Sequence, residues 1–529
     1  MREEILRTIR ERGLLLEKEL FDILDGFENV NDAKNFLEQL ERYSGQKIIT
    51  KSVLNKNIEF VKSMVGNLAG ENKNIINSIF VKLGISLEIR KESAIIGKDS
   101  GNSEEVKTRG DNYQPKYEVV CANTADGKKL EVGDFVGGFR ARYQQLQRIL
   151  MQRTELQNLI SIGKISSQRQ SLSIIGIVTE KRITKNNNLI IKFEDMTGEI
   201  IGIVKAEMED VFKKAQDLQL DDVVGIKAAG NRDMLFVFDI IYPDAMLPEK
   251  TKFNEDISIA FMSDIHSGSN MHLRKNFEKF LEWINSDNEH AKKIKYIFFV
   301  GDNVDGVGVF PGQENFLELK SIKEQYELLA SYLRRIPKHI TLFMCPGQHD
   351  ASRVAEPQPA IDKKYGKPLY EIENLVLVTN PALVKIFEDK KEFKVLMYHG
   401  ASIHSFINEI QELRESRAHN TPARAVKEML RRRHLAPTHS SVTYIPNLNG
   451  DFLVIEEIPD VLTIGEVHRL DIENYNNILI ITNSCWQSQT PFEEKVGNIP
   501  DPCKIAVLNL KTRELKVFDF SDEEEVNKK

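Results

Sequence analysis

The chain has 529 residues, 41% of them hydrophobic and 29% charged, which is the composition of a globular protein and a length that suits two or three domains. It contains no run of about 18 apolar residues and no apolar segment after its charged N-terminus, so the sequence predicts a cytoplasmic protein without a membrane span. The net charge of −7 argues against a protein that grips nucleic acid unaided, because phosphate binding needs a local basic patch or a partner that supplies one.

Residues 1–90 show helical periodicity, with apolar side chains such as Ile5, Ile9 and Leu16 recurring near helical spacing. The pattern predicts a small helical domain, and it fits a self-contained bundle as well as a docking domain for a partner protein. Residues 91–116 are polar and have almost no apolar periodicity, which predicts a flexible linker.

Residues 117–250 are predicted to form an OB-fold domain with a preceding helix. Apolar residues on one side of segment 140–162 predict the helix, and short β-branched runs separated by turn residues predict strands between 170 and 244. A helical piece at 207–215 interrupts these strands, which fits the five-stranded OB-fold barrel. OB-folds bind single-stranded nucleic acid or dock proteins, and the lack of an obvious run of exposed aromatic residues favours docking.

Residues 251–520 alternate apolar strands with helical segments such as 275–285 and 318–335, a pattern typical of an α/β domain. Residues 521–529 are predicted to form an acidic tail.

Carboxylates and imidazoles follow five predicted strands of this α/β domain. The five loops are Asp264-Ile265-His266, Gly301-Asp302-Asn303-Val304-Asp305, Pro346-Gly347-Gln348-His349-Asp350, His399-Gly400 and Gly465-Glu466-Val467-His468. Ligands collect beyond the carboxyl ends of strands in open α/β sheets, so these loops are predicted to converge at one rim. Any single loop has an ordinary structural interpretation, but five in succession predict a site for manganese, iron or zinc.

The order of these loops resembles that of the calcineurin-like metallophosphoesterases, which carry DxH, GDxxD, GNH(D/E), H and GHxH in succession. This resemblance implies an αββα sandwich. Longer stretches are similar to the small subunits of archaeal family D DNA polymerases, and the similarity extends from about residue 117 to residue 520. These stretches are SDIHSGS, GDNVDGVGVFPGQE, PGQHDASRVAEPQPAI, YHGASIHSFI, RRRHLAPTHSS and NSCWQSQTPFEEK. The similarity implies a DNA replication protein that binds DNA and a large catalytic subunit and carries a proofreading 3′–5′ exonuclease site.

Carried over to this chain, the resemblance implies two divalent metal ions, expected to be Mn²⁺, and a catalytic role for His349 beside the scissile phosphate. The implied ligands of the first ion are Asp264, His266, Asp302 and His468. The implied ligands of the second ion are Asp302, which bridges the two, Gln348, His399 and Glu466. Two cations about 3.5–4 Å apart acidify a water and stabilise both the attacking and the leaving oxygen.

Two residues depart from the family pattern, and both fall on the second ion. Gln348 stands where the family has the asparagine of GNH, and Glu466 stands where it has the first histidine of GHxH. Glutamine still offers an amide oxygen, displaced by roughly 1.5 Å through its extra methylene. Glutamate is an oxygen donor that raises manganese affinity and weakens Lewis acidity.

Two functions stay open on these grounds: an active exonuclease subunit, and a silent phosphoesterase that serves as a scaffold of the polymerase. A stand-alone phosphatase or repair nuclease shares the metal motif, but the OB-like domain before the motif disfavours it.

Three further features have weaker interpretations. The run Arg431–His434 either contacts phosphate or is a solvated helix end, with the helix end favoured. Trp486 either stacks on a base or packs in the core, with core packing favoured. The four cysteines lie far apart without a CxxC pair, which predicts reduced thiols. No Walker motif, Rossmann fingerprint or polymerase aspartate constellation is evident, so nucleotide polymerisation is expected of the large subunit.

Overall fold

The computed structural model describes residues 115–522 apart from 123, 125–128, 449 and 497, together with a few earlier positions: Ile9, Leu15–Leu16, Lys34, Ile48–Ile49 and Glu88–Lys91. Strand β1 (Leu15–Leu16) pairs in parallel with β2 (Ile48–Ile49), so Leu16 is in a strand and not in the predicted helix. Strand β3 (Glu88–Lys91) lies where the predicted helical domain ends and the predicted linker begins, so these residues are in neither a helix nor a loop. Most of the predicted helical domain and of the linker lies outside the described residues, as do residues 523–529 of the acidic tail.

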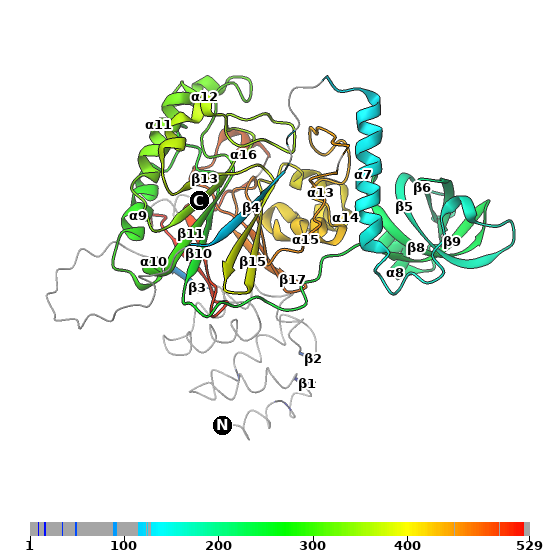
Figure 1. Ribbon diagram of the computed structural model, residues 1–529. Coiled ribbons are helices and arrows are strands. Elements are labelled where there is room, and N and C mark those ends of the chain that lie inside the picture. The colour runs from blue at the N-terminus through cyan, green and yellow to red at the C-terminus, as the bar shows by residue number, and fades with distance from the viewer. Residues whose placement is uncertain are drawn as a thin grey trace. The chain divides into compact units, whose positions relative to one another are not determined.

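Two mixed sheets form the centre of the C-terminal region (Figure 1). In the first sheet, β13-β12-β11-β10 run parallel and β19 joins β10 antiparallel. The bounds are β10 Ser258–Met262, β11 Ile294–Val300, β12 Thr341–Cys345, β13 Leu375–Leu377 and β19 Lys504–Asn509, followed by β20 at Leu515–Asp519. The second sheet has the order β17-β18-β16-β15-β14-β4, with parallel pairs at its centre and antiparallel pairs towards both ends. Its bounds are β4 Tyr117–Cys121, β14 Ala382–Glu388, β15 Lys391–Tyr398, β16 Val461–Ile464, β17 Asp471–Tyr475 and β18 Ile478–Thr482.

Helices cover the outer faces of both sheets. Apolar side chains of β10, β11 and β12 pack on α9 and α11, and those of β15, β16 and β18 pack on α13 and α15. The helix bounds are α9 Arg274–Ile284, α10 Glu289–Lys293, α11 Ile322–Leu333, α12 Lys363–Gly366, α13 Ile403–Glu409, α14 Gln411–Glu415, α15 Ala423–Arg432 and α16 Pro491–Val496.

Aromatic rings join the two sheets on their inner faces. Phe298 stacks between Phe261 and Phe343, with ring centroids 5.4 and 5.2 Å away, and Tyr117 of the second sheet meets Phe343 edge-on at 5.0 Å. The resulting layer order is helix, sheet, sheet, helix, which confirms the predicted α/β sandwich.

Strand β4 corrects the predicted domain boundary. Residues 117–121 were grouped with the barrel, but they pair antiparallel with β14 and form the edge of the second sheet. The strand is short and largely exposed, so its sequence carries no alternation that would reveal which sheet it joins.

A closed barrel of five strands, β5-β6-β7-β9-β8, follows helix α7, and α8 lies between its third and fourth strands in the chain. The bounds are α7 Val132–Leu150, β5 Gln170–Ile183, β6 Leu189–Asp195, β7 Gly198–Val204, α8 Glu209–Gln216, β8 Val223–Asn231 and β9 Met234–Ile241. Helix α7 begins earlier and ends earlier than the predicted segment 140–162. Its start is fixed by a reciprocal capping box between Glu131 and Asp134, and Leu156 joins the same apolar cluster from a turn beyond the helix.

The run Arg431–His434 is neither a phosphate contact nor a solvated helix end, contrary to both interpretations. Arg432 is 2% exposed and its Nε lies 3.1 Å from Asp222 of the barrel, while His434 is 1% exposed and pairs with Asp451. Arg432 is buried where the barrel packs on the C-terminal end of α15, and Arg433 donates to the backbone oxygen of Ile455, so the hydrogen bonds of both guanidinium groups are satisfied.

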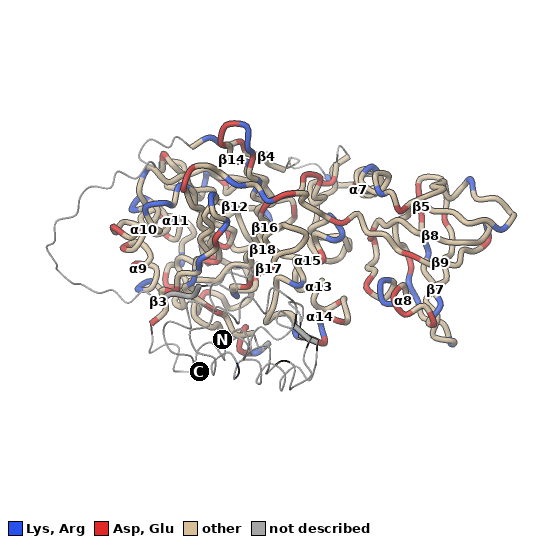
Figure 2. The backbone as a smooth tube through the Cα atoms, turned by 90° about the horizontal axis from the view of Figure 1, so that it is seen from below, with Lys and Arg blue, Asp and Glu red and all other residues tan. Residues whose placement is uncertain are grey.

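Trp486 is fully buried against Phe277, at 4.8 Å between ring centroids, which confirms core packing and excludes base stacking. The four cysteines are free thiols, as predicted. In the described part of the chain, no helix is both long and apolar enough to cross a membrane. Figure 2 shows basic and acidic residues interspersed along the described chain and not gathered into one basic stretch.

Candidate metal centre

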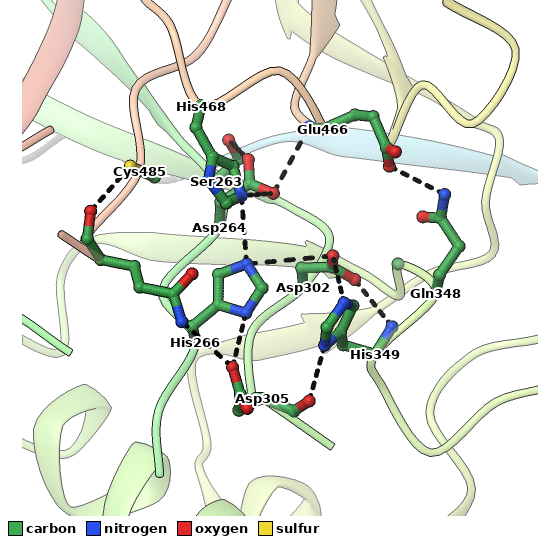
Figure 3. A network of polar contacts seen from close by, with 12 residues as sticks. Ser263, Asp264, His266, Asp302, Asp305, Gln348, His349, Glu466, His468 and Cys485 are labelled. Atoms are coloured by element: carbon green, nitrogen blue, oxygen red, sulfur yellow. Dashed lines mark hydrogen bonds and ion pairs between the residues drawn. The ribbon is translucent and has the colours of Figure 1, made fainter. Parts of the chain in front are cut away.

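The five loops predicted from the sequence do meet, each directly after a buried strand. Asp264 follows β10, Asp302 follows β11, His399 follows β15 and Glu466 follows β16, with Gln348 and His349 in the loop after β12. The first sheet supplies three of these loops and the second sheet supplies two. Figure 3 shows side chains of four of these loops gathered at the rim of the sandwich: Asp264, His266, Asp302, Gln348, His349, Glu466 and His468.

The backbone of this rim is unusual. Five site residues have positive φ angles of 46–70°, in the left-handed region that non-glycine residues seldom adopt: Asp264, His266, Asp302, Glu466 and His468. Gly347 permits the closest approach, since a Cβ there would stand 2.2 Å from Asp302 Oδ1 and 2.7 Å from His399 Nε2. The surrounding fold therefore stabilises backbone conformations that are unfavourable by themselves, and these conformations bring the polar side chains together.

One group of ligand atoms comes from Asp264, His266 and His468, whose candidate atoms all lie within 4.8 Å of one another. His468 Nε2 is 3.5 Å from Asp264 Oδ1 and 3.2 Å from His266 Nε2. Asp302 Oδ2 lies 4.0 Å from His266 Nε2, which connects it to this group.

A second group comes from Asp264, Asp302 and His399, again within 4.8 Å. His399 Nε2 is 3.3 Å from Asp302 Oδ2 and 3.2 Å from Glu466 Oε2. Gln348 reaches the same place, because its Nε2 donates to Glu466 Oε2 at 2.8 Å. The two residues that depart from the family pattern therefore touch each other.

His349 stands at the more open side of the rim, with 21% of its side chain exposed. Its backbone N–H donates to Asp302 Oδ1 at 2.9 Å, and its Nδ1 donates to the backbone oxygen of Asp305 at 2.6 Å. Its Nε2 is thereby left to face the rim, 3.9 Å from Asp302 Oδ2. All eight site residues predicted from the sequence are thus linked by contacts of 4.0 Å or less.

The hydrogen bonds of the imidazoles fit a cation site. Three rings engage Nδ1 on an outer acceptor and turn Nε2 inward: His266 on Asp305 Oδ1 at 3.1 Å, His399 on Val300 O at 2.9 Å and His468 on Glu493 Oε1 at 3.0 Å. This is the arrangement by which protein histidines present a lone pair to a metal.

Gln348 supplies an independent test of fit. Its Oε1 is buried and has no hydrogen-bond partner among the described residues, although a buried amide oxygen is costly to leave unpaired. Together with carboxylate oxygens and imidazole nitrogens, this orphaned oxygen completes a donor set that suits a divalent ion such as Mn²⁺.

The electrostatics of the rim are those of closely packed opposite charges. Burial opposes ionisation of Asp302, but the neighbouring imidazoles of His399 and His349 hold its pKa well below the usual value. Burial likewise disfavours the charged ring of His399, yet Asp302 raises its pKa well above the ordinary value. Burial also opposes ionisation of Glu466, but hydrogen bonds from His399 and His404 lower its pKa. The carboxylates therefore keep a negative charge that cations can neutralise.

Several residues around the site were not predicted from the sequence. Asp305 accepts from His266 and also from Gln487 Nε2 at 3.2 Å, and His404 Nε2 lies 3.5 Å from Glu466 Oε1. The second aspartate of GDNVD was a visible signal for Asp305. His404 lies in YHGASIHSFI and Glu493 in NSCWQSQTPFEEK, two of the stretches similar to the family, but their contacts depend on which loops the fold brings alongside.

Comparisons with known proteins complete these observations. The family of DNA polymerase alpha/epsilon B-subunits matches residues 259–470. The chain is 36% identical over 431 residues to the DNA polymerase II small subunit of Pyrococcus abyssi, covering 78% of this chain and 68% of that protein. It is 36% identical over 432 residues to the DNA polymerase II small subunit of Methanothermobacter thermautotrophicus, covering 79% and 87%. A solved structure described as a novel archaeal phosphodiesterase is 14% identical and covers 49% of this chain and 98% of its own, with a TM-score of 0.25 that is too low to support a conclusion about the fold.

Proposed function

Since the chain belongs to the family of archaeal DNA polymerase II small subunits, we propose that it carries the metal-dependent 3′–5′ exonuclease of such a polymerase and partners a large catalytic subunit. The observation that carries this proposal is the inward-facing set of carboxylate, imidazole and amide donors at the rim of the sandwich. The sandwich is then a calcineurin-like phosphoesterase domain, and the barrel an OB-fold.

In this proposal the donor set would hold two cations. Asp264, His266, Asp302 and His468 would hold the first ion, and Asp302 with Gln348, His399 and Glu466 would hold the second. Bound divalent cations acidify a water and neutralise charge that develops on a phosphodiester.

His349 is the residue placed to handle a proton. Its Nδ1–H is fixed on the carbonyl oxygen of Asp305, which orients Nε2 toward the open side of the rim where a scissile phosphate would bind. A proton on Nε2 can then pass to the leaving 3′ oxygen of DNA. Asp302 also accepts a hydrogen bond from the backbone N–H of His349, so the proposed metal ligand and the proton donor are positioned together.

A specific observation favours a second candidate function, a silent scaffold. Glu466 is hydrogen-bonded to Gln348 and lies within ion-pair distance of His399 and His404, so its charge is already shared among protein groups. A carboxylate held in this way competes with a second cation for the same contacts. If the contacts of Glu466 with protein groups outcompete the second cation, the chain supports the large subunit without hydrolysing DNA.

The two functions are separated by digestion of a single-stranded or 3′-recessed DNA primer with Mn²⁺. We expect the chain to release nucleotides from the 3′ end and Asp302→Asn to release none. Asp460→Asn is the matched control, since Asp460 is a buried carboxylate that accepts from the backbone of Lys394 at 3.0 Å and from Thr251 at 3.3 Å, away from the rim. A parent chain that releases no nucleotide, or an Asp302→Asn variant as active as the parent, would favour the scaffold.

Polymerisation itself is assigned to the large subunit, because the described residues hold no second cluster of acidic ligands outside this rim. The net charge of −7 fits a subunit that relies on that partner for much of its grip on DNA.

A further inference from the structure

Glu493 contacts the outer edge of a metal-site histidine. Its Oε1 accepts a hydrogen bond from His468 Nδ1 at 3.0 Å, and its side chain is 8% exposed. It lies in α16, 25 residues after His468 in the chain. Neither the sequence pattern nor the proposed reaction assigns it a role.

The carboxylate of Glu493 is itself immobilised. Its Oε2 accepts from the backbone N–H of Thr490 at 2.8 Å and from the Thr490 hydroxyl at 2.9 Å, and Asn498 Nδ2 donates to Oε1 at 3.3 Å. With four donors around two oxygens, the carboxylate has one orientation. The side chain of His468 is therefore held against a fixed acceptor.

A fixed acceptor at Nδ1 decides what the other ring nitrogen can do. When Nδ1 carries the proton that Glu493 accepts, Nε2 of a neutral ring presents its lone pair. That Nε2 is the atom that faces Asp264 Oδ1 at 3.5 Å and His266 Nε2 at 3.2 Å. His266 is arranged in the same way by Asp305, so two lone pairs converge where the proposed function puts the first cation.

We propose that Glu493 is a positioning residue for the first cation, acting through the tautomer and ring orientation of His468. This inference rests on the proposed metal site, but it concerns metal binding and not turnover. Carboxylates that orient a ligating histidine typically change metal affinity by about 10–100-fold when they are removed.

The competing explanation is that Glu493 only caps a helix. Thr490 and Glu493 form a reciprocal capping box, because Glu493 N–H also donates to the Thr490 hydroxyl at 3.2 Å. Thr490→Ala removes that hydroxyl and leaves the contact to His468 intact, which makes it the matched control. Glu493→Gln retains the size of the side chain but offers only one acceptor oxygen. If its amide N–H faces His468, Nδ1 must accept, so the ring proton moves to Nε2 and the lone pair that would face the cation is lost.

The test is a titration of the full chain with Mn²⁺, in which the electron paramagnetic resonance signal reports the concentration of free Mn²⁺. We expect Glu493→Gln to weaken the tightest site about 10–100-fold, Glu493→Asp to restore part of the loss because it keeps the charge, and Thr490→Ala to stay within about threefold of the parent. The inference is overturned if Glu493→Gln binds as tightly as the parent, or if Thr490→Ala loses as much affinity as Glu493→Gln.

The same titration keeps this inference apart from the proposed function. A parent chain that binds no Mn²⁺ would overturn both. A parent that binds Mn²⁺ but digests no DNA would overturn the exonuclease and leave the result on Glu493 standing.

Discussion

The contact between Gln348 and Glu466 makes a quantitative prediction about the second cation position. Gln348 Nε2 donates to Glu466 Oε2 at 2.8 Å, and the same oxygen lies 3.2 Å from His399 Nε2. Gln348→Asn shortens the amide by one methylene, about 1.5 Å, which is enough to break this bond. Glu466→His removes the charge that the amide and His399 both face. The two changes should therefore not act independently.

The magnitude follows from the type of bond. A hydrogen bond to a charged group contributes about 1.5–3 kcal/mol, and each 1.4 kcal/mol is about tenfold in a rate or binding constant. We expect either single variant to lower kcat/KM for Mn²⁺-dependent digestion by about 10–100-fold. The double variant restores the ligands of the family pattern, so it should reach or exceed the parent.

The assay is a double-mutant cycle on kcat/KM, repeated on Mn²⁺ affinity. Since each single variant should lose about 1.4–2.8 kcal/mol and the double variant none, the expected coupling energy is about 3–5.5 kcal/mol, whereas distant residues add within about 0.5 kcal/mol. Gln348→Asn combined with Asp460→Asn serves as the additive control. Independent effects of Gln348→Asn and Glu466→His would refute the reasoning, and so would a double variant poorer than either single one.

Three further predictions concern a buried carboxyl group, a buried ion pair and the binding of Mn²⁺. Glu356 is 1% exposed and burial raises its pKa to about 8 from an ordinary 4.5, so the folded chain keeps a proton that the unfolded chain releases between these pH values. Stability should then fall as pH rises through this window, and Glu356→Gln should flatten the pH dependence of the thermal unfolding midpoint; an unchanged profile would contradict the assignment. Arg432→Met leaves Asp222 buried without its partner and should lower the free energy of unfolding in urea by about 3–5 kcal/mol. Arg424→Met removes an ion-pair partner that is 36% exposed and should lower it by under about 1 kcal/mol. Equal losses would show that burial of the Arg432–Asp222 pair contributes nothing to stability. Mn²⁺ at about 100 times its Kd should raise the unfolding free energy of the parent by about 2.7 kcal/mol, an effect that a chelator reverses and that Asp302→Asn should lack.

Local features of the sequence were sufficient to predict the alternation of strands and helices in the sandwich and the side chains that meet at its rim. The strands that precede Asp264, Asp302 and His399 end in apolar runs, and such runs are recognised directly in the sequence. The carboxyl ends of parallel strands in one sheet share one edge, so chain order predicts that the Asp264 and Asp302 loops converge; the His399 loop joins them only because the second sheet packs on the first. The five barrel strands and the packing of Trp486 were likewise predictable.

The burial of the run Arg431–His434 and the sheet that β4 joins depended on tertiary packing and could not be predicted from local sequence. The run Arg431–His434 has the sequence of a polar helix end, and only tertiary packing makes buried pairs of its side chains: Arg432 pairs with Asp222 of the barrel and His434 with Asp451. Strand β4 is too short and too exposed to show which sheet it joins.

The sequence by itself determined which carboxylate and imidazole side chains stand at the ends of the strands, since that is a matter of local order along the chain. Tertiary structure alone decided that Gln348 touches Glu466, 118 residues away, and that Glu493 holds His468. The physical reason is that hydrogen bonds form over about 3 Å, and loop conformations set by distant packing decide such distances.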